Sequence, residues 1–483
     1  MRILYLDLDT LRPDHLGCYG YLRNTSPNID RIASEGVRFE NYYTADAPCL
    51  PSRSALFNGR FGIHTGIVGH GGTAADLRLE GRDRSFASRP QFATWMTALE
   101  QAGLYTVSVS PYAERHAAWW FYNGFREMYN PGKGGMERAD EVAPHALRWI
   151  KDNAQRDNWF LQVNFWDPHT PYRTPMEYGN PFEGEPVPDW LTEDILDGHR
   201  KSYGPHSACE PWGFDEWNHP ELPRVPSEIA SLDDFRKAID GYDVGIRYMD
   251  DHIGMIFNAL DAAGVLDETA VIISADHAEN LGELNIYGDH HTADHITSRV
   301  PLIVRWPGMK GGTVDHGLHY NLDLTRTVAE LTGAAITPTW DGKSFAPVLQ
   351  KGGDCGRDYL VVSQCAWSCQ RAVRWGPWIL VRTYHDGLKD FPEVMLFNIE
   401  DDPHETRNVA GDNPAVVNEG LAKLEHWHGT MMDTSDYAED PLWRVVREGG
   451  PFHTRGMLAQ YCQRLRDTGR GHHADKLEKQ YTG

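Results

Sequence analysis

The chain has 483 residues, with 69 acidic side chains against 46 basic ones and a formal net charge of −23 when histidine is neutral. Aromatic residues make up 11% of it, which excludes global disorder, because disordered chains are poor in aromatic residues. No window approaches the roughly 18 consecutive apolar residues that a transmembrane helix needs. The acidic balance argues against nucleic acid as the main partner, since phosphate binding requires a basic face. We therefore expect a folded chain with no nucleic-acid partner and no membrane partner.

The N-terminal segment MRILYLDLDT runs directly into a strand-like pattern. It has neither the extended apolar region nor the small-residue cleavage site of a signal peptide. Seven cysteines, an odd number, are spread over the chain, which is not the spacing of a disulfide framework. Provided that Met1 is the natural start, the sequence predicts a cytoplasmic protein.

Predicted strands and helices alternate along the first part of the chain. In chain order they are a strand at 3–8, helices at 27–36 and 91–102, a strand at 104–110, a helix at 146–153, a strand at 159–166, a long helix at about 235–263 and a strand at 269–275. This alternation is typical of a doubly wound α/β sheet. Residues 173–230 interrupt it, and we expect them to form an irregular excursion over the active-site face.

From about residue 360 the pattern changes to short strands separated by turns. The predicted strands are at 359–364, 370–375, 377–384 and 394–399, with a helix near 413–427. We therefore expect a catalytic domain over 1–360 and a smaller α+β subdomain, built on an antiparallel sheet, over 361–483.

Polar side chains follow two of the predicted strands. Asp7 and Asp9 lie at the end of the first strand, and Asp276 and His277 follow the strand at 269–275. Taken singly, each is more simply a capping or solvated residue. However, ligands of open α/β sheets bind beyond the carboxyl ends of strands, where one site would collect all four. Carboxylates with one imidazole form a hard site for a divalent cation.

Cys49 lies just before a predicted helix that begins near Pro51. The unpaired N–H groups and the dipole of a helix N-terminus favour an anion, and Arg53 adds a bidentate donor. These residues alone leave two interpretations open for Cys49, a nucleophilic thiolate or a buried structural cysteine.

The segment Cys49-Leu50-Pro51-Ser52-Arg53 reproduces C-x-P-S-R, the signature of formylglycine-dependent sulfatases. Other segments resemble this family in the same order, namely DTLRPDHLGCYGY (9–21), PNIDRIASEGVRFENYYT (27–44), NFWDPHTPY (164–172), IISADHAENLGE (272–283) and HHTADHITSRVPLIVRWPG (290–308). The resemblance extends to about residue 410. It implies an alkaline-phosphatase-like α/β fold, with a large mixed, mostly parallel sheet flanked by helices and a smaller C-terminal antiparallel sheet subdomain.

The resemblance also implies a reaction, the hydrolysis of a sulfate ester. A formylglycine-generating or maturase enzyme would convert Cys49 to formylglycine, whose hydrated form attacks sulfur and later expels sulfate. One divalent metal, Ca²⁺ with Mg²⁺ or Mn²⁺ as alternatives, would be held by Asp9, Cys49, Asp276 and His277. Arg53 would stabilise the developing charge, and His169 or His291 would protonate the leaving group.

The sequence departs from the family in three places. The family's G-K-x-H motif has no lysine in the equivalent stretch, 109–125, so Arg115 or His116 is expected to replace that contact with sulfate. His290 stands where the family has a lysine before the histidine, and it becomes a further candidate for binding sulfate. Thr10 replaces a second aspartate, so Asp7 is expected to complete the metal shell.

The expected substrate is a small sulfated molecule, most simply a saccharide. A strongly negative surface gives no long-range attraction for polyanionic chains, whereas the cation and Arg53 act locally on sulfate. One alternative is a phosphonate monoester or phosphodiester hydrolase of the same superfamily. Another is a binding protein that has kept the fold without its activity.

Overall fold

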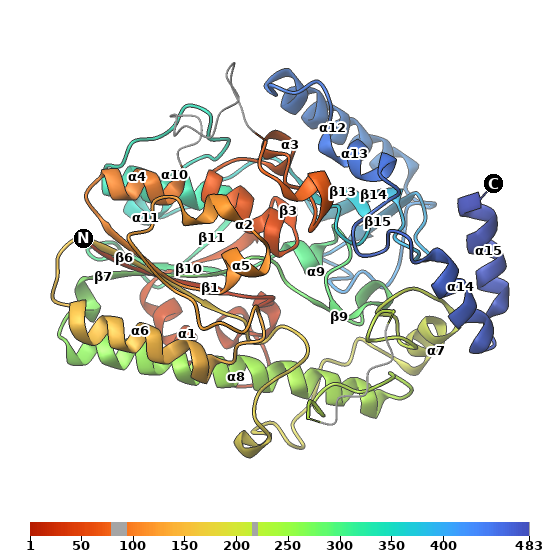
Figure 1. The fold of residues 1–483 in the computed structure, drawn as a ribbon, viewed down its shortest axis with the longest axis horizontal. Coiled ribbons are helices and arrows are strands. Elements are labelled where there is room, and N and C mark those ends of the chain that lie inside the picture. Colours follow the sequence, from red (N-terminus) through yellow and green to blue (C-terminus); the bar gives the residue numbers. More distant parts are fainter. Residues whose placement is uncertain (79–93, 215–220, 483) are drawn as a thin grey trace.

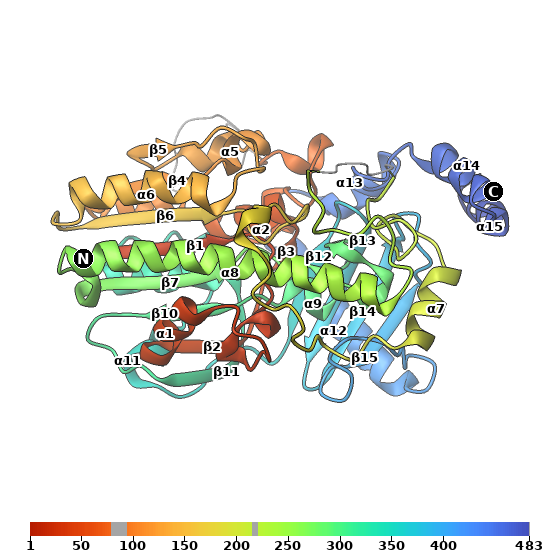
Figure 2. The same ribbon diagram turned by 90° about the horizontal axis from the view of Figure 1, so that it is seen from below.

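The computed structural model describes residues 1–78, 94–214 and 221–482 of the chain. Figures 1 and 2 show a large sheet between two layers of helices, with a smaller sheet beside it. Helices α1, α6 and α8 cover one face of the large sheet, and α2, α4 and α10 cover the other. None of the described helices is long and apolar enough to cross a membrane.

The large sheet has eight strands in the order β11-β2-β10-β7-β1-β6-β4-β5. Neighbouring strands are parallel, except that β10 runs antiparallel to both β2 and β7. The strands are β1 (Arg2–Leu8), β2 (Val37–Tyr43), β4 (Tyr105–Val109), β5 (Glu127–Tyr129), β6 (Trp159–Phe165), β7 (Thr269–Ala275), β10 (Leu302–Arg305) and β11 (Thr313–Tyr320).

The small sheet has five strands in the order β15-β14-β13-β12-β3. They are β3 (Asp46–Ala47), β12 (Leu360–Gln364), β13 (Cys369–Trp375), β14 (Trp378–His385) and β15 (Val394–Asn398). The four C-terminal strands are antiparallel, whereas β3 pairs in parallel with β12. A two-stranded ribbon, β8 (Asn280–Leu281) with β9 (Tyr287–Asp289), lies apart from both sheets.

The helices connect and cover these strands. They are α1 (Pro27–Glu35), α2 (Cys49–Asn58), α3 (Gly62–Thr65), α4 (Trp95–Gln101), α5 (Tyr112–Arg115), α6 (Ala139–Asn153), α7 (Glu193–Lys201), α8 (Leu232–Ala262), α9 (His295–Ser298), α10 (Asn321–Thr332), α11 (Ala346–Lys351), α12 (Pro414–Asp433), α13 (Pro441–Arg447), α14 (Leu458–Asp467) and α15 (Gly471–Thr482).

The three central strands end in one row, and this row positions the candidate site. β1 lies between β6 and β7, and all three are almost continuously buried, as expected where helices cover both faces of a parallel sheet. In this register Asp7 is paired with Asn164 on one side and Ser274 on the other. The residues that follow the carboxyl ends of the three strands therefore lie close together.

The predicted fold class is confirmed, and the differences are local. Helix α6 begins before the predicted start at 146, because the side chain of Glu141 accepts a hydrogen bond from the Arg138 amide (3.0 Å) and caps the helix upstream of Pro144. The excursion at 173–230 contains the regular helix α7. Of the helix predicted at 91–102, residues 91–93 lie outside the described residues. The domain boundary near 360 stays a prediction, since β3 joins the small sheet from the N-terminal part of the chain.

Candidate active site at the ends of the central strands

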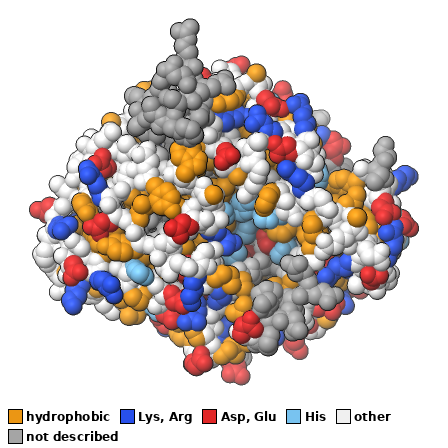
Figure 3. Space-filling view, viewed as in Figure 1, with side chains coloured by type: hydrophobic (Ala, Val, Ile, Leu, Met, Phe, Trp, Pro, Cys, Tyr) orange, Lys and Arg blue, Asp and Glu red, His pale blue; other side chains and the backbone are white. Residues whose placement is uncertain are grey.

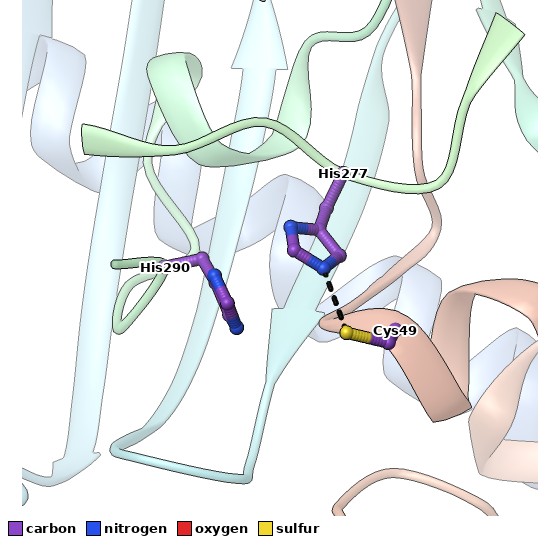
Figure 4. A group of neighbouring side chains, drawn as sticks. All are labelled: Cys49, His277 and His290. Carbon is purple, nitrogen blue, oxygen red and sulfur yellow. Dashed lines mark hydrogen bonds between the residues drawn. The ribbon is translucent and has the colours of Figure 1, made fainter. Parts of the chain in front are cut away.

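Cys49 is the first residue of α2, separated from β3 by Pro48, rather than the residue before a helix as expected. Its side chain is buried, and Sγ lies 3.1 Å from Nε2 of His277, the contact drawn in Figure 4. The pairing of β3 with β12 fixes the backbone immediately before Cys49. Position 49 is thus held between the two sheets and faces the ends of β1 and β7.

Arg53 lies one turn further along α2 and meets three buried carboxylates. Its Nε and Nη2 donate to the two oxygens of Asp7 at 2.9 and 3.0 Å. Nη2 also lies 3.1 Å from Asp9 Oδ2, and Nη1 donates to Asp276 Oδ2 at 2.5 Å. One guanidinium neutralises only part of this charge. Because unpaired buried carboxylates are costly, the cluster favours a second cation.

The donors around Asp9 fit a divalent metal. Among the described residues, none donates a hydrogen bond to either carboxylate oxygen of Asp9, although both oxygens are buried. One ligand atom from each of Asp9, Cys49, Asp276 and His277 lies within 4.8 Å of the others. Nδ1 of His277 lies 2.9 Å from the carbonyl oxygen of Ala278, which leaves the Nε2 lone pair directed at the group. These are the residues that could hold the expected ion.

Asp7 lies beside this group of ligands and contacts Arg53 instead. Besides its two bonds to Arg53, its Oδ2 accepts a hydrogen bond from Nε2 of Gln162 at 3.0 Å. Its role as a metal ligand therefore stays a prediction, while its observed contacts orient the guanidinium.

The environment of Cys49 disfavours a simple thiolate. Burial, followed by the negative charges of Asp9 and Asp276, raises the pKa of the Cys49 thiol well above its usual range. A cysteine that acts as a nucleophile needs the opposite shift. Without a cation, this environment therefore favours the uncharged thiol at position 49.

Three candidate histidines gather on the open side of Cys49. The ring of His290 lies 4.1 Å from that of His277 and 5.6 Å from that of His169 (centroid distances; Figure 4 shows the first pair). The ring of His291 is stacked on Trp367 at 4.1 Å. Burial is the main cause that lowers the pKa of all three, to about 3 for His169, where Arg115 adds to the effect. Burial therefore disfavours the charged form of each of these imidazoles.

A carboxylate that the motifs did not single out holds this histidine group together. Asp289 Oδ2 lies 3.2 Å from Nε2 of His206, and Oδ1 lies 3.4 Å from Nε2 of His291 and 3.6 Å from Nδ1 of His290. Burial alone would raise the pKa of Asp289, but the three imidazoles hold it well below its usual range. His206 comes from the excursion at 173–230, so that segment does reach the site.

Arg115 and His116 lie on the other side of Arg53. The Arg115 guanidinium lies 4.8 Å over the ring of Trp166 and donates to the carbonyl oxygen of Gly134 at 2.9 Å. His116 contacts Tyr112 (5.3 Å between centroids), whose ring in turn lies 5.0 Å from the Arg53 guanidinium carbon. Figure 3 shows histidine atoms gathered in a hollow at the centre of this face. Trp166 and Tyr112 thus link Arg115 and His116 to Arg53, whose guanidinium carbon lies 5.8 Å from the Trp166 ring.

Several site residues lie in segments that carried no recognised motif. They are His70, His206, Asp289, Trp367 and His453. Glu279 lies within the family-like segment 272–283 but was not expected to be a site residue. Glu279 is buried and accepts a hydrogen bond from the Tyr172 hydroxyl at 2.9 Å, and burial raises its pKa well above the usual range. Asp289 could have been identified from the sequence, because it directly precedes the two candidate histidines His290 and His291. The others come from loops whose arrangement depends on the tertiary fold.

Comparisons with known proteins agree with this geometry. The sulfatase family model matches residues 2–334, and the model for the C-terminal part of N-sulphoglucosamine sulphohydrolase matches residues 282–426. The choline-sulfatase of Rhizobium meliloti (strain 1021) is 25% identical over 475 residues, which cover 85% of this chain and 83% of that protein.

Two solved structures share the fold. BT4656 in complex with its substrate D-glucosamine-2-N,6-O-disulfate has a TM-score of 0.71 and 20% identity, covering 91% of this chain and 99% of its own. The phosphonate monoester hydrolase of Agrobacterium radiobacter has a TM-score of 0.67 and 19% identity, covering 89% and 96%. The resemblance seen in the motifs is confirmed: the chain belongs to the sulfatase family, a class of sulfuric ester hydrolases.

Proposed function

We propose that this chain hydrolyses the sulfate ester of a small carbohydrate, with formylglycine at position 49 and one divalent metal, Ca²⁺. The observation that carries the proposal is the position of Cys49, at the start of α2 between His277 and Arg53. It lies beside the buried carboxylate of Asp9, to which no described residue donates a hydrogen bond. Formation of the aldehyde requires a formylglycine-generating or maturase enzyme as a partner.

Asp9, Asp276, His277 and the residue at position 49 would hold the metal. Their hard oxygen donors suit Ca²⁺, and the imidazole also admits Mg²⁺ or Mn²⁺. Such an ion supplies positive charge that acidifies a hydroxyl and polarises a sulfate oxygen. Arg53, fixed by Asp7, presents its charge one helical turn from position 49 and would stabilise negative charge that develops there.

His291 is the candidate that is best supported as the proton donor to the leaving oxygen. Its Nε2 lies 3.4 Å from Asp289, whereas Nδ1 of His169 is 2.5 Å from the carbonyl oxygen of its neighbour Thr170. A carboxylate stabilises the protonated imidazole that an acid catalyst requires. His169, His290, Arg115 and His116 would contact the bound ester.

Parallel assays test the function. Purified protein is assayed with 4-nitrophenyl sulfate, with 4-nitrophenyl phenylphosphonate and with a panel of sulfated mono- and disaccharides. The proposal expects turnover of the aryl sulfate and of at least one sulfated sugar. Turnover of the phosphonate ester with no sulfate ester hydrolysed would favour the second candidate function, which the shared fold with a phosphonate monoester hydrolase supports.

Removal of the metal is expected to abolish activity and to lower the melting temperature. Without the cation, the carboxylates around Arg53 repel one another, so chelation by EDTA acts on stability as well as on turnover. Asp9→Asn is expected to weaken metal affinity by about 10–100-fold, which titration of the metal-free protein with Ca²⁺, Mg²⁺ or Mn²⁺ measures. Full activity after exhaustive chelation would contradict this assignment.

A further inference from the structure

A series of ring contacts connects His291 with Arg53. Trp367 is stacked between His291 and His453, with centroid distances of 4.1 and 4.5 Å. His70 follows, 5.1 Å from His453 and 5.0 Å from His116. His116 then contacts Tyr112, which lies under Arg53. Both faces of Trp367 are covered, so its indole is not free to stack on a sugar.

We call the three middle histidines, His70, His116 and His453, the imidazole wall. Burial is the first cause that lowers the pKa of each, to about 4 for His453. A neutral imidazole has one N–H donor and one acceptor nitrogen. The wall therefore matches hydroxyl groups, which both donate and accept, better than it matches a second anionic group.

Two nitrogens of the wall have no hydrogen-bond partner in the part of the chain that the structure describes. They are Nε2 of His70 and Nε2 of His116, and both atoms are buried. Buried polar atoms are normally paired, and an unpaired one costs about 1–3 kcal/mol. A bound molecule with hydroxyl groups would satisfy both atoms. The other nitrogen of His70, Nδ1, lies 2.9 Å from Nε2 of His453 and is already used.

His453 reaches this position because a C-terminal loop docks beside the site. The ring of Phe452 packs so closely on Gly71 that a Cβ on that glycine would lie 2.2 Å from it. The amide of His453 donates to the carbonyl oxygen of Ala366 at 3.1 Å. This loop follows α13 and lies beyond residue 426, where the matched family models end.

We infer that His70 and His116 bind hydroxyl groups of the saccharide that carries the sulfate ester, and that His453 positions His70 for this contact. The inference rests on the proposed function and narrows its substrate. The sugar beside the cleaved ester presents free hydroxyl groups to the wall. His453 is a positioning residue, since it acts through His70.

The test compares a substrate with hydroxyl groups and one without them. The variants are His70→Phe and His453→Phe, in which the ring is kept and both nitrogens are lost. Their kcat/KM is measured for the best sulfated monosaccharide of the panel and for 4-nitrophenyl sulfate. The matched control is His426→Phe on the exposed side of α12, which should leave both values unchanged.

The expected result is a selective loss. For each wall variant, kcat/KM for the sugar sulfate should fall about 10–100-fold relative to the aryl sulfate, mainly through KM. Equal losses on both substrates, or no loss on either, would overturn the inference. A parent protein that hydrolyses 4-nitrophenyl sulfate but no sulfated sugar would also overturn it and leave the sulfatase activity standing.

Discussion

Cys49→Ala is expected to lower kcat for any sulfate ester by roughly ten-thousand-fold or more, because it removes the only group proposed to attack sulfur. The substitution also removes one of the four clustered metal donors. The fold should survive, since alanine fits the space of a buried, uncharged cysteine at the first position of α2. The measurements are kcat with 4-nitrophenyl sulfate and the melting temperature.

Mass spectrometry tests whether the thiol of Cys49 is converted to an aldehyde. The peptide that contains position 49 should carry the mass change for thiol-to-aldehyde conversion in active preparations, and activity should scale with the converted fraction. Cys209→Ala is the matched control. Cys209 is half-buried, and its thiol donates to the carbonyl oxygen of Arg200. Full activity of protein whose Cys49 remains a thiol would refute the proposed nucleophile.

Arg53→Met is expected to reduce both stability and turnover. It keeps most of the side-chain volume but leaves Asp7, Asp9 and Asp276 without their shared cation. Breaking a buried ion pair from one side costs about 3–5 kcal/mol in the free energy of unfolding. The loss of a donor aimed at developing charge lowers kcat by about 100–1,000-fold. Denaturant unfolding and steady-state kinetics measure the two effects.

Arg371→Met provides the comparison for Arg53. Arg371 is also buried, and it donates to both oxygens of Asp440, at 2.6 and 2.9 Å, in the small sheet. Its loss should destabilise the protein similarly while the folded fraction keeps its kcat. If Arg53→Met lowered stability but left kcat of the folded protein unchanged, Arg53 would be a structural residue only.

The sequence predicts well those parts of the site that lie at strand ends. Asp9, Asp276 and His277 follow β1 and β7, two adjacent buried strands that hydrophobic patterning identifies, so their meeting follows from the topology. The role of Asp7 was harder to predict. Two carboxylates two residues apart look equivalent on a strand, and only the position of Arg53 across the site distinguishes them.

The remainder of the site depends on long-range packing that no local pattern encodes. His70 and His453 are separated by most of the chain, yet they form one hydrogen bond. β3 is two residues long, which is too short for a strand pattern in the sequence. It forms a strand because it pairs with β12. His206 lies in an excursion rich in proline and glycine, where the direction of a side chain follows from tertiary contacts.

The pairing of β3 with β12 has a consequence for biosynthesis. About three hundred residues separate Cys49 from the strand that fixes its backbone, so β12 leaves the ribosome long after Cys49 does. Once the two strands pair, the side chain of Cys49 is only 1% exposed and a modifying enzyme has no access to it. Any covalent change at this thiol must therefore be complete while the chain is still nascent or unfolded. The length of the intervening chain sets the time available for it.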